Sequence, residues 1–393
     1  MRKTIFTGLI IGILSLIALA PVAIGAPGDV IWTQAGNPSA YGDWANGVVV
    51  SGSSIYIVGS DQYLGSTNPR WRIEKRSLTN GSVIWTQASN PSGGWDEAYG
   101  VAVDGTGVYI VGYDSYLGNY RWRIEKRSLT TGSVIWIKTS NPSASGDIAF
   151  AVAVDGTGIY TVGMDEYFYL NSRWRIDKRS LTTGNVIWTT TSNGSASWDY
   201  AYGVAVDGTG VYIVGSDSYP GFSNSRWRME KRSLATGSPI WTRISNPSTS
   251  DDWASGVAVD NSGVYIVGAD SYLGYSNARW RMEKRSLTTG DSIWTKASNP
   301  SSSFDEAFGV AVDSSGVYTI GFDEYLGYSD TRWRIEKRSL TSGSNIWTKA
   351  SNPSSSFDEA FGVAVDGSGV YIVGYDEFPG SGNSRWRIEK RAP

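Results

Sequence analysis

The stretch from Tyr99 to Ile137, YGVAVDGTGVYIVGYDSYLGNYRWRIEKRSLTTGSVIWI, reads as four short β-strands. The first two, Tyr99–Val103 and Val108–Tyr113, flank an Asp-Gly pair. Such a pair between apolar runs is a strong hairpin signal, because glycine accepts the positive φ that the turn requires. We expect the third strand at Arg121–Lys126 and the fourth at Val134–Ile137. Valine, isoleucine, tyrosine and tryptophan crowd these segments, as half-buried pleated surfaces prefer.

The same unit recurs seven times. An Ile-Trp pair returns every 51 to 53 residues, and the run Ile293–Asp313 is repeated without change as Ile346–Asp366. The tryptophans of this pair are Trp32, Trp85, Trp136, Trp188, Trp241, Trp294 and Trp347. Seven copies of a four-stranded unit of about 40 to 55 residues are typical of a β-propeller. We therefore predict an all-β fold of seven blades, each with four antiparallel strands.

The ends of the repeat array predict how the ring closes. The first copy begins at its fourth strand, Asp29–Thr33, and the last copy stops after its third, Arg385–Lys390. Pairing of the N-terminal strand with the last blade would complete that blade and leave no open edge. Residues 27–393 are therefore predicted to form one propeller domain.

The first 26 residues have the composition of a signal peptide. Arg2 and Lys3 precede an apolar run from Thr4 to Ala20, and small residues follow up to Ala26. The alternative is an uncleaved membrane anchor, since about 20 apolar residues can span a bilayer. Both interpretations predict export, to the cell surface or beyond it, with membrane contact only through this segment if it stays uncleaved.

Composition excludes several classes of chemistry. The 393 residues include no histidine and no cysteine. Imidazole bases, thiolate nucleophiles, disulfides and histidine- or cysteine-ligated metals are therefore excluded. Without Arg2 and Lys3 the chain has 32 basic and 37 acidic residues, a net charge of −5, which argues against a nucleic-acid partner. We expect no cofactor, and no bound metal because no Asp-x-Asp-x-Asp-Gly calcium loop occurs.

Two short motifs resemble known propeller repeats. Residues 131–136, TGSVIW, resemble the tryptophan-docking segment of pyrroloquinoline-quinone-type propellers, whose indole packs against the neighbouring blade. Residues 96–109, DEAYGVAVDGTGVY, are similar to the seven-bladed repeat of exported bacterial surface proteins often called SBBP. The resemblance implies blade-docking roles for the seven Ile-Trp tryptophans and an exported propeller, and it does not extend to a quinone site.

Two recurring polar groups are expected to be structural. Asp104 and its counterparts lie at the hairpin turn, where aspartate bonds its own backbone. Arg121 and Arg123 alternate along a middle strand that adjacent blades should cover, so each needs a carboxylate partner. Asp114 and Glu125 are the obvious partners, and we predict a ring of such pairs around the propeller.

A third recurring group is the candidate binding site. Its aspartates each precede a first, innermost strand and are expected at the mouth of the central channel: Asp43, Asp96, Asp147, Asp199, Asp252, Asp305 and Asp358. Aromatic residues stand beside them: Trp44, Trp95, Trp198, Trp253, Phe304 and Phe357. The loops after the second strands add Tyr63, Tyr116, Tyr167, Tyr219 and Tyr272 on the same face. Carboxylates beside aromatic platforms suit carbohydrate or peptide ligands. The alternative is that each aspartate caps its own loop and each aromatic packs on a neighbour.

The sequence favours a binding protein over an enzyme. Nearly every polar residue has six counterparts, whereas catalysis needs one group in a distinct environment. We predict a non-catalytic scaffold that contacts protein or polysaccharide through one loop face. The alternatives are a carboxylate-dependent polysaccharide lyase or glycosidase, and a purely structural surface protein.

Overall fold

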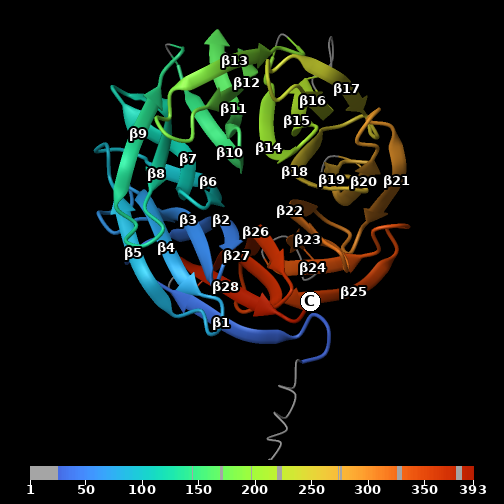
Figure 1. Cartoon of the computed structure of the whole chain (residues 1–393). Helices are drawn as coiled ribbons and strands as arrows, with labels where there is room; N and C mark the ends of the chain where they lie inside the picture. Colours follow the sequence, from blue (N-terminus) through green and yellow to red (C-terminus); the bar gives the residue numbers. More distant parts are fainter. Residues whose placement is uncertain are drawn as a thin grey trace, which may run out of the picture.

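The computed structural model describes residues 25–143, 145–168, 171–195, 197–218, 224–272, 274, 277–324, 330–377 and 383–393. Seven four-stranded antiparallel sheets stand in a ring around a central channel (Figure 1). The predicted signal peptide lies outside the described residues up to position 24. Within the described part of the chain, no helix has the length and apolar character needed to cross a membrane.

Six blades place their four strands from the channel outward in sequence order, and the last blade takes its outermost strand, β1, from the start of the chain, so that the layers of the ring are equivalent. The innermost strands are β2 (Asp43–Ser51), β6 (Glu97–Asp104), β10 (Asp147–Asp155), β14 (Tyr200–Asp207), β18 (Asp252–Asp260), β22 (Asp305–Asp313) and β26 (Asp358–Asp366). The second strands are β3 (Ser54–Asp61), β7 (Gly107–Tyr116), β11 (Gly158–Phe168), β15 (Gly210–Ser218), β19 (Gly263–Asp270), β23 (Gly316–Asp323) and β27 (Gly369–Glu377). The third strands are β4 (Arg70–Ser77), β8 (Asn119–Arg127), β12 (Asn171–Arg179), β16 (Ser225–Arg232), β20 (Arg279–Arg285), β24 (Arg332–Arg338) and β28 (Ser384–Arg391). The outermost strands are β5 (Val83–Ser89), β9 (Val134–Ser140), β13 (Val186–Ser192), β17 (Pro239–Ser245), β21 (Ser292–Ser298), β25 (Asn345–Ser351) and β1 (Val30–Gly36). We number the blades 1 to 7 from β2.

The ring closes as predicted. β1 pairs antiparallel with β28, and the last sheet has the order β1-β28-β27-β26. In Figure 1 the first and last segments of the described chain lie side by side in this blade. Thr33 stands opposite Glu389 in the ladder. The seven-bladed fold and its closure are therefore confirmed.

The hairpin prediction also holds. A carboxylate oxygen of Asp104 accepts the backbone N–H groups of Thr106 at 2.7 Å and Gly107 at 3.0 Å. Each predicted strand of blade 2 is present and extends one to three residues further at one or both ends, as is usual for strand boundaries.

Tryptophans join neighbouring blades at two depths. The predicted outer set docks on the next blade: the Trp85 indole donates to the carbonyl of Leu129 at 3.4 Å. The third-strand tryptophans lie deeper, and Trp71 is fully buried and donates to the carbonyl of Tyr113 at 2.9 Å. The sequence predicted contacts between blades only for the outer set, the tryptophans of the Ile-Trp pairs. The third-strand set makes the shorter and more buried bond.

The predicted ring of ion pairs is present within the blades. In blade 2, Asp114 bonds both Arg121 and Arg123, and the Arg123 guanidinium continues to Glu125 at 2.7 Å. Arg127 reaches the other oxygen of Glu125 at 2.6 Å. In blade 2 the two buried carboxylates, Asp114 and Glu125, each meet two guanidinium groups, so both are compensated within the blade. These arginine side chains are therefore occupied by ion pairs inside the blade.

Candidate functional site

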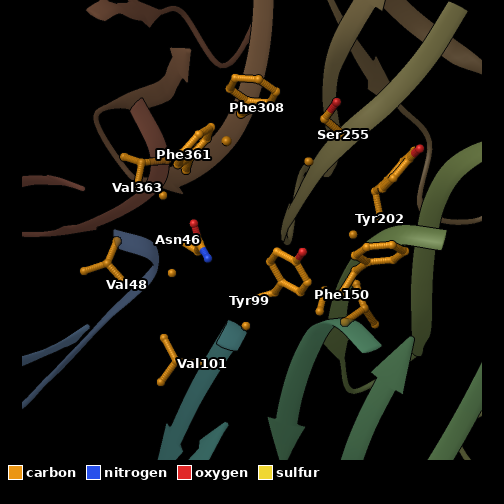
Figure 2. A pocket seen from close by; sticks show the side chains of 18 of the residues that line it. Asn46, Val48, Tyr99, Val101, Phe150, Tyr202, Ser255, Phe308, Phe361 and Val363 are labelled. Atoms are coloured by element: carbon orange, nitrogen blue, oxygen red, sulfur yellow. The ribbon is translucent and has the colours of Figure 1, made fainter. Parts of the chain in front are cut away.

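A β-bulge at the same position of every innermost strand shapes the channel. In blade 1 the ladder shifts between Ala45 and Gly47, so that Asn46 has no partner on β3. Such an extra residue re-aims its side chain. The seven bulged residues, which we call the collar, are Asn46, Tyr99, Phe150, Tyr202, Ser255, Phe308 and Phe361. All seven line a cavity of about 780 Å³ (Figure 2).

Glycine beside the collar lets neighbouring bulges approach. A Cβ added to Gly47 would meet the carbonyl oxygen of Tyr99 in the next blade at 2.7 Å. A Cβ on Gly256 would meet that of Phe308 at the same distance. The innermost strands therefore sit close enough for collar side chains of adjacent blades to touch.

The collar consists of two aromatic arcs separated by two small polar residues. Ring centroids are 5.6 Å apart for Tyr99 and Phe150, and 5.4 Å apart for Phe150 and Tyr202. Phe308 and Phe361 form the second arc at 5.3 Å. These spacings fall in the range of favourable aromatic pairs. Asn46 and Ser255 occupy the breaks between the arcs (Figure 2). Further along the channel, the lining is valine in every blade: Val48, Val101, Val152, Val204, Val257, Val310 and Val363.

The predicted aspartates are not ligand-facing. All seven of the set Asp43, Asp96, Asp147, Asp199, Asp252, Asp305 and Asp358 are completely buried. Asp252 shows the common arrangement: it accepts the backbone N–H and the hydroxyl of Ser248 and the backbone N–H of Ser271. Burial raises its pKa to about 6 despite these hydrogen bonds. These groups cap their own loops, which is the alternative that the sequence left open.

The predicted aromatics divide between the channel and the loops. Trp44, Trp95 and Trp253 line the channel with the collar. Phe304 stacks on Trp253 with ring centroids 5.9 Å apart, and Phe357 is partly exposed.

The remaining aromatics lie farther out. Trp198 stacks on Tyr200 at 6.1 Å. Tyr116 lies under the guanidinium of Arg121 at 4.0 Å, an arrangement shared by Tyr63 and Tyr272. Tyr219 lies outside the described residues, as does the side chain of Tyr167.

Three glutamates at the channel mouth were not singled out from sequence. Glu97, Glu306 and Glu359 occupy equivalent positions on β6, β22 and β26, where the other blades carry Trp44, Ile148, Tyr200 and Trp253. In the sequence, the acidic residue at a repeat position that is apolar or aromatic in the other blades was the signal that could have identified them. They are the asymmetric polar groups of an otherwise regular ring.

These glutamates are held by neutral donors. Glu97 accepts the Asn46 amide at 2.9 Å and the Tyr99 hydroxyl at 3.2 Å. Glu306 accepts the Trp253 indole N–H and, at 3.2 Å, the Ser255 hydroxyl.

Burial raises the pKa of all three glutamates. It raises the pKa of Glu306 to about 8 despite the Trp253 hydrogen bond, and the nearby Glu359 acts in the same direction as burial. Burial likewise raises the pKa of Glu359 to about 7 and that of Glu97 above its ordinary value. Across the described residues, no three carboxylates gather closely enough to hold a metal ion.

Comparisons with known proteins support the fold alone. No family model and no curated protein matches the chain, so the resemblance to the exported SBBP repeat stays a prediction. A quinohemoprotein alcohol dehydrogenase from Pseudomonas putida HK5 is similar in structure, with a TM-score of 0.50 and 12% identity over 88% of this chain. The chain spans 66% of that enzyme. Sqt1 from Chaetomium thermophilum has a TM-score of 0.51 and 11% identity over 88% of this chain and 82% of its own.

Proposed function

We propose that this protein is an exported, non-catalytic binding scaffold that contacts a protein or polysaccharide at the mouth of its central channel. One observation carries the proposal: an aromatic collar of five rings lines a cavity of about 780 Å³ that the blades leave unfilled. Cavities of about 300 to 1,000 Å³ lined by apolar and aromatic side chains are the usual form of binding sites. The signal-peptide composition of residues 1–26 supports the extracytoplasmic setting.

The distribution of polar groups supports binding over catalysis. The recurring aspartates and arginines are tied into loop caps and ion pairs, so they serve the scaffold. The mouth presents mainly rings, which give contact area to a sugar face or an apolar side chain.

The experiment compares a collar variant with a matched surface variant. Phe150, Tyr202 and Phe308 are changed to alanine in one protein. Ile135, Ile187 and Ile346, which are about half-exposed on the outer strands, are changed to alanine in the other. Soluble-glycan arrays and pull-downs from cell-surface extracts are run with both and with the unchanged protein. We expect ligands that the collar variant loses and the outer-strand variant keeps; no ligand in either assay, or equal loss in both variants, would refute the proposal.

A second candidate rests on the glutamates. Two carboxyls with raised pKa on adjacent blades, Glu306 and Glu359, resemble the acid and base pair of a polysaccharide-cleaving enzyme. This candidate predicts release of new sugar ends from a polysaccharide, abolished by Glu306→Gln or Glu359→Gln alone. Unchanged turnover in both variants would eliminate it.

A further inference from the structure

The two breaks in the collar lie beside glutamates. Asn46 and Ser255 are its only non-aromatic members, and each donates a hydrogen bond to the glutamate of the next blade, Glu97 and Glu306 respectively. A small side chain at a break opens the cavity toward the carboxyl behind it. Glu359 lies one blade beyond Glu306 and interacts with it electrostatically.

The charge balance at this break differs from that of the blades. Within blade 6, Glu336 meets Arg334 at 2.7 Å and Arg338 at 2.6 Å. Glu306 is only 8% exposed, yet its hydrogen-bond donors are the neutral groups of Trp253 and Ser255. Among the described residues that line the cavity there is no lysine or arginine. A carboxyl this deeply buried, with no cation in the lining, leaves a place for positive charge.

Aromatic faces border the same place. Phe308 and Phe361 present the second arc of the collar, and Trp253 and Phe304 stack beside it. Such faces attract an organic cation through the ring quadrupole, most strongly when water is excluded. A metal ion would instead require several oxygen ligands at once. A neutral sugar would bring no charge to stabilise the ionised form of Glu306.

Building on the proposed function, we infer that the cavity binds an organic cation, a protonated alkylamine or a guanidinium group, between the Phe308–Phe361 faces and the carboxyls of Glu306 and Glu359. The cation has two sources, a lysine or arginine side chain of a partner protein and a free amine. Both present the same chemistry to the site.

Proton release accompanies this binding. A cation beside Glu306 favours its ionised form and displaces the proton that burial keeps there. The titratable groups that face this pair are Tyr202 from β14, which interacts with Glu306, and Tyr375 and Glu324, which interact with Glu359. Burial raises the pKa of Glu306 to about 8 and that of Glu359 to about 7, so the released proton comes from these two carboxyls.

The test is isothermal titration calorimetry at pH 7 on the full protein. The free probes are n-butylammonium and n-butylguanidinium chloride, with n-butanol as the uncharged match. The peptide probes are acetylated, amidated Gly-Lys-Gly and Gly-Arg-Gly, with Gly-Gln-Gly as the uncharged match. We expect the charged probes to bind, the uncharged ones not to bind, and the heat to vary with buffer ionisation enthalpy. Tighter binding of the peptides assigns the source to a protein, and tighter binding of the free probes assigns it to a small amine.

Variants locate the site. We expect the Phe308→Leu/Phe361→Leu protein to bind roughly two- to thirtyfold more weakly. The Glu306→Gln/Glu359→Gln protein should bind at least about tenfold more weakly and release no proton. Asp291→Asn, which removes an exposed carboxylate far from the channel, should change affinity less than about twofold.

The outcomes separate this inference from the proposed function. Equal binding of butanol and butylammonium, or undiminished binding in both channel variants, would overturn the cation site. A glycan or protein that binds at the collar while every cation probe fails would overturn the cation site alone. Loss of no ligand in any channel variant would overturn both.

Discussion

The two depths of tryptophan docking give a sharp prediction about stability. Blade 1 contains one tryptophan of each kind, Trp71 on the third strand and Trp85 on the outer strand. Phenylalanine at either position keeps an aromatic ring and removes the indole N–H. At Trp71 the substitution leaves the buried carbonyl of Tyr113 without its donor, which now stands at 2.9 Å.

The magnitude follows from burial and bond length. Leaving a buried carbonyl without a hydrogen-bond donor lowers the free energy of unfolding by about 1 to 3 kcal/mol. The space left by the smaller ring lowers it by about a further 1 kcal/mol. We therefore expect Trp71→Phe to lower the free energy of unfolding by about 2 to 4 kcal/mol. Trp85 is half-buried and its bond to Leu129 is 3.4 Å long. Its substitution should cost less than about 1 kcal/mol, because water can replace a weak, accessible hydrogen bond.

Urea denaturation followed by circular dichroism measures both costs, provided that the slope of the transition is unchanged. Equal losses, or a larger loss at Trp85, would mean that the outer docking motif holds the blades together and that the buried bond is incidental. The reasoning about depth would then be refuted.

Three further predictions concern pH, closure and charge. The pKa of Glu306 is raised to about 8 by burial, so its contribution to stability is complete below its ordinary value of 4.5 and is lost as pH rises through 8; the melting temperature should fall over this range, and less so in Glu306→Gln. Removing residues 1–36 deletes β1 and exposes β28 as an edge, so size-exclusion chromatography should show oligomers where the full chain gives one species. Glu283→Gln leaves Arg281 and Arg285 buried without their shared carboxylate and should cost about 3 to 5 kcal/mol in denaturation; a loss below about 1 kcal/mol would show that these pairs are dispensable.

The fold could be predicted because its signals are local and repeated. The hairpin signal at Asp104 and the Ile-Trp pair recur at a nearly fixed spacing, so each copy of the repeat strengthens the strand assignment of the others. Closure through β1 could also be predicted, because the first and last copies are complementary fragments of one blade.

The site could be predicted only in part. Aspartate before an innermost strand serves equally as loop cap and as ligand, and the sequence around Asp252 does not show that its carboxylate is already occupied by Ser248. The collar depends on a β-bulge, which has no fixed sequence signature. Its local trace is the glycine that follows the bulged residue in six of the seven blades, with Ala151 in the remaining one. Glu306 breaks the repeat visibly, but its burial and its neutral hydrogen-bond donors depend on how neighbouring blades pack, which the sequence does not show.

The bulge places the channel-lining collar positions outside the ladder that builds each blade. Because the collar residue has no cross-strand partner, the ladder does not fix its side chain, and the seven copies carry asparagine, serine, tyrosine and phenylalanine there. If the collar binds a ligand as proposed, recognition and architecture are encoded by different positions of the repeat. A duplicated blade could then change its ligand by substitution of one collar residue. Protein design could change the channel lining in the same way while the blades stay unchanged.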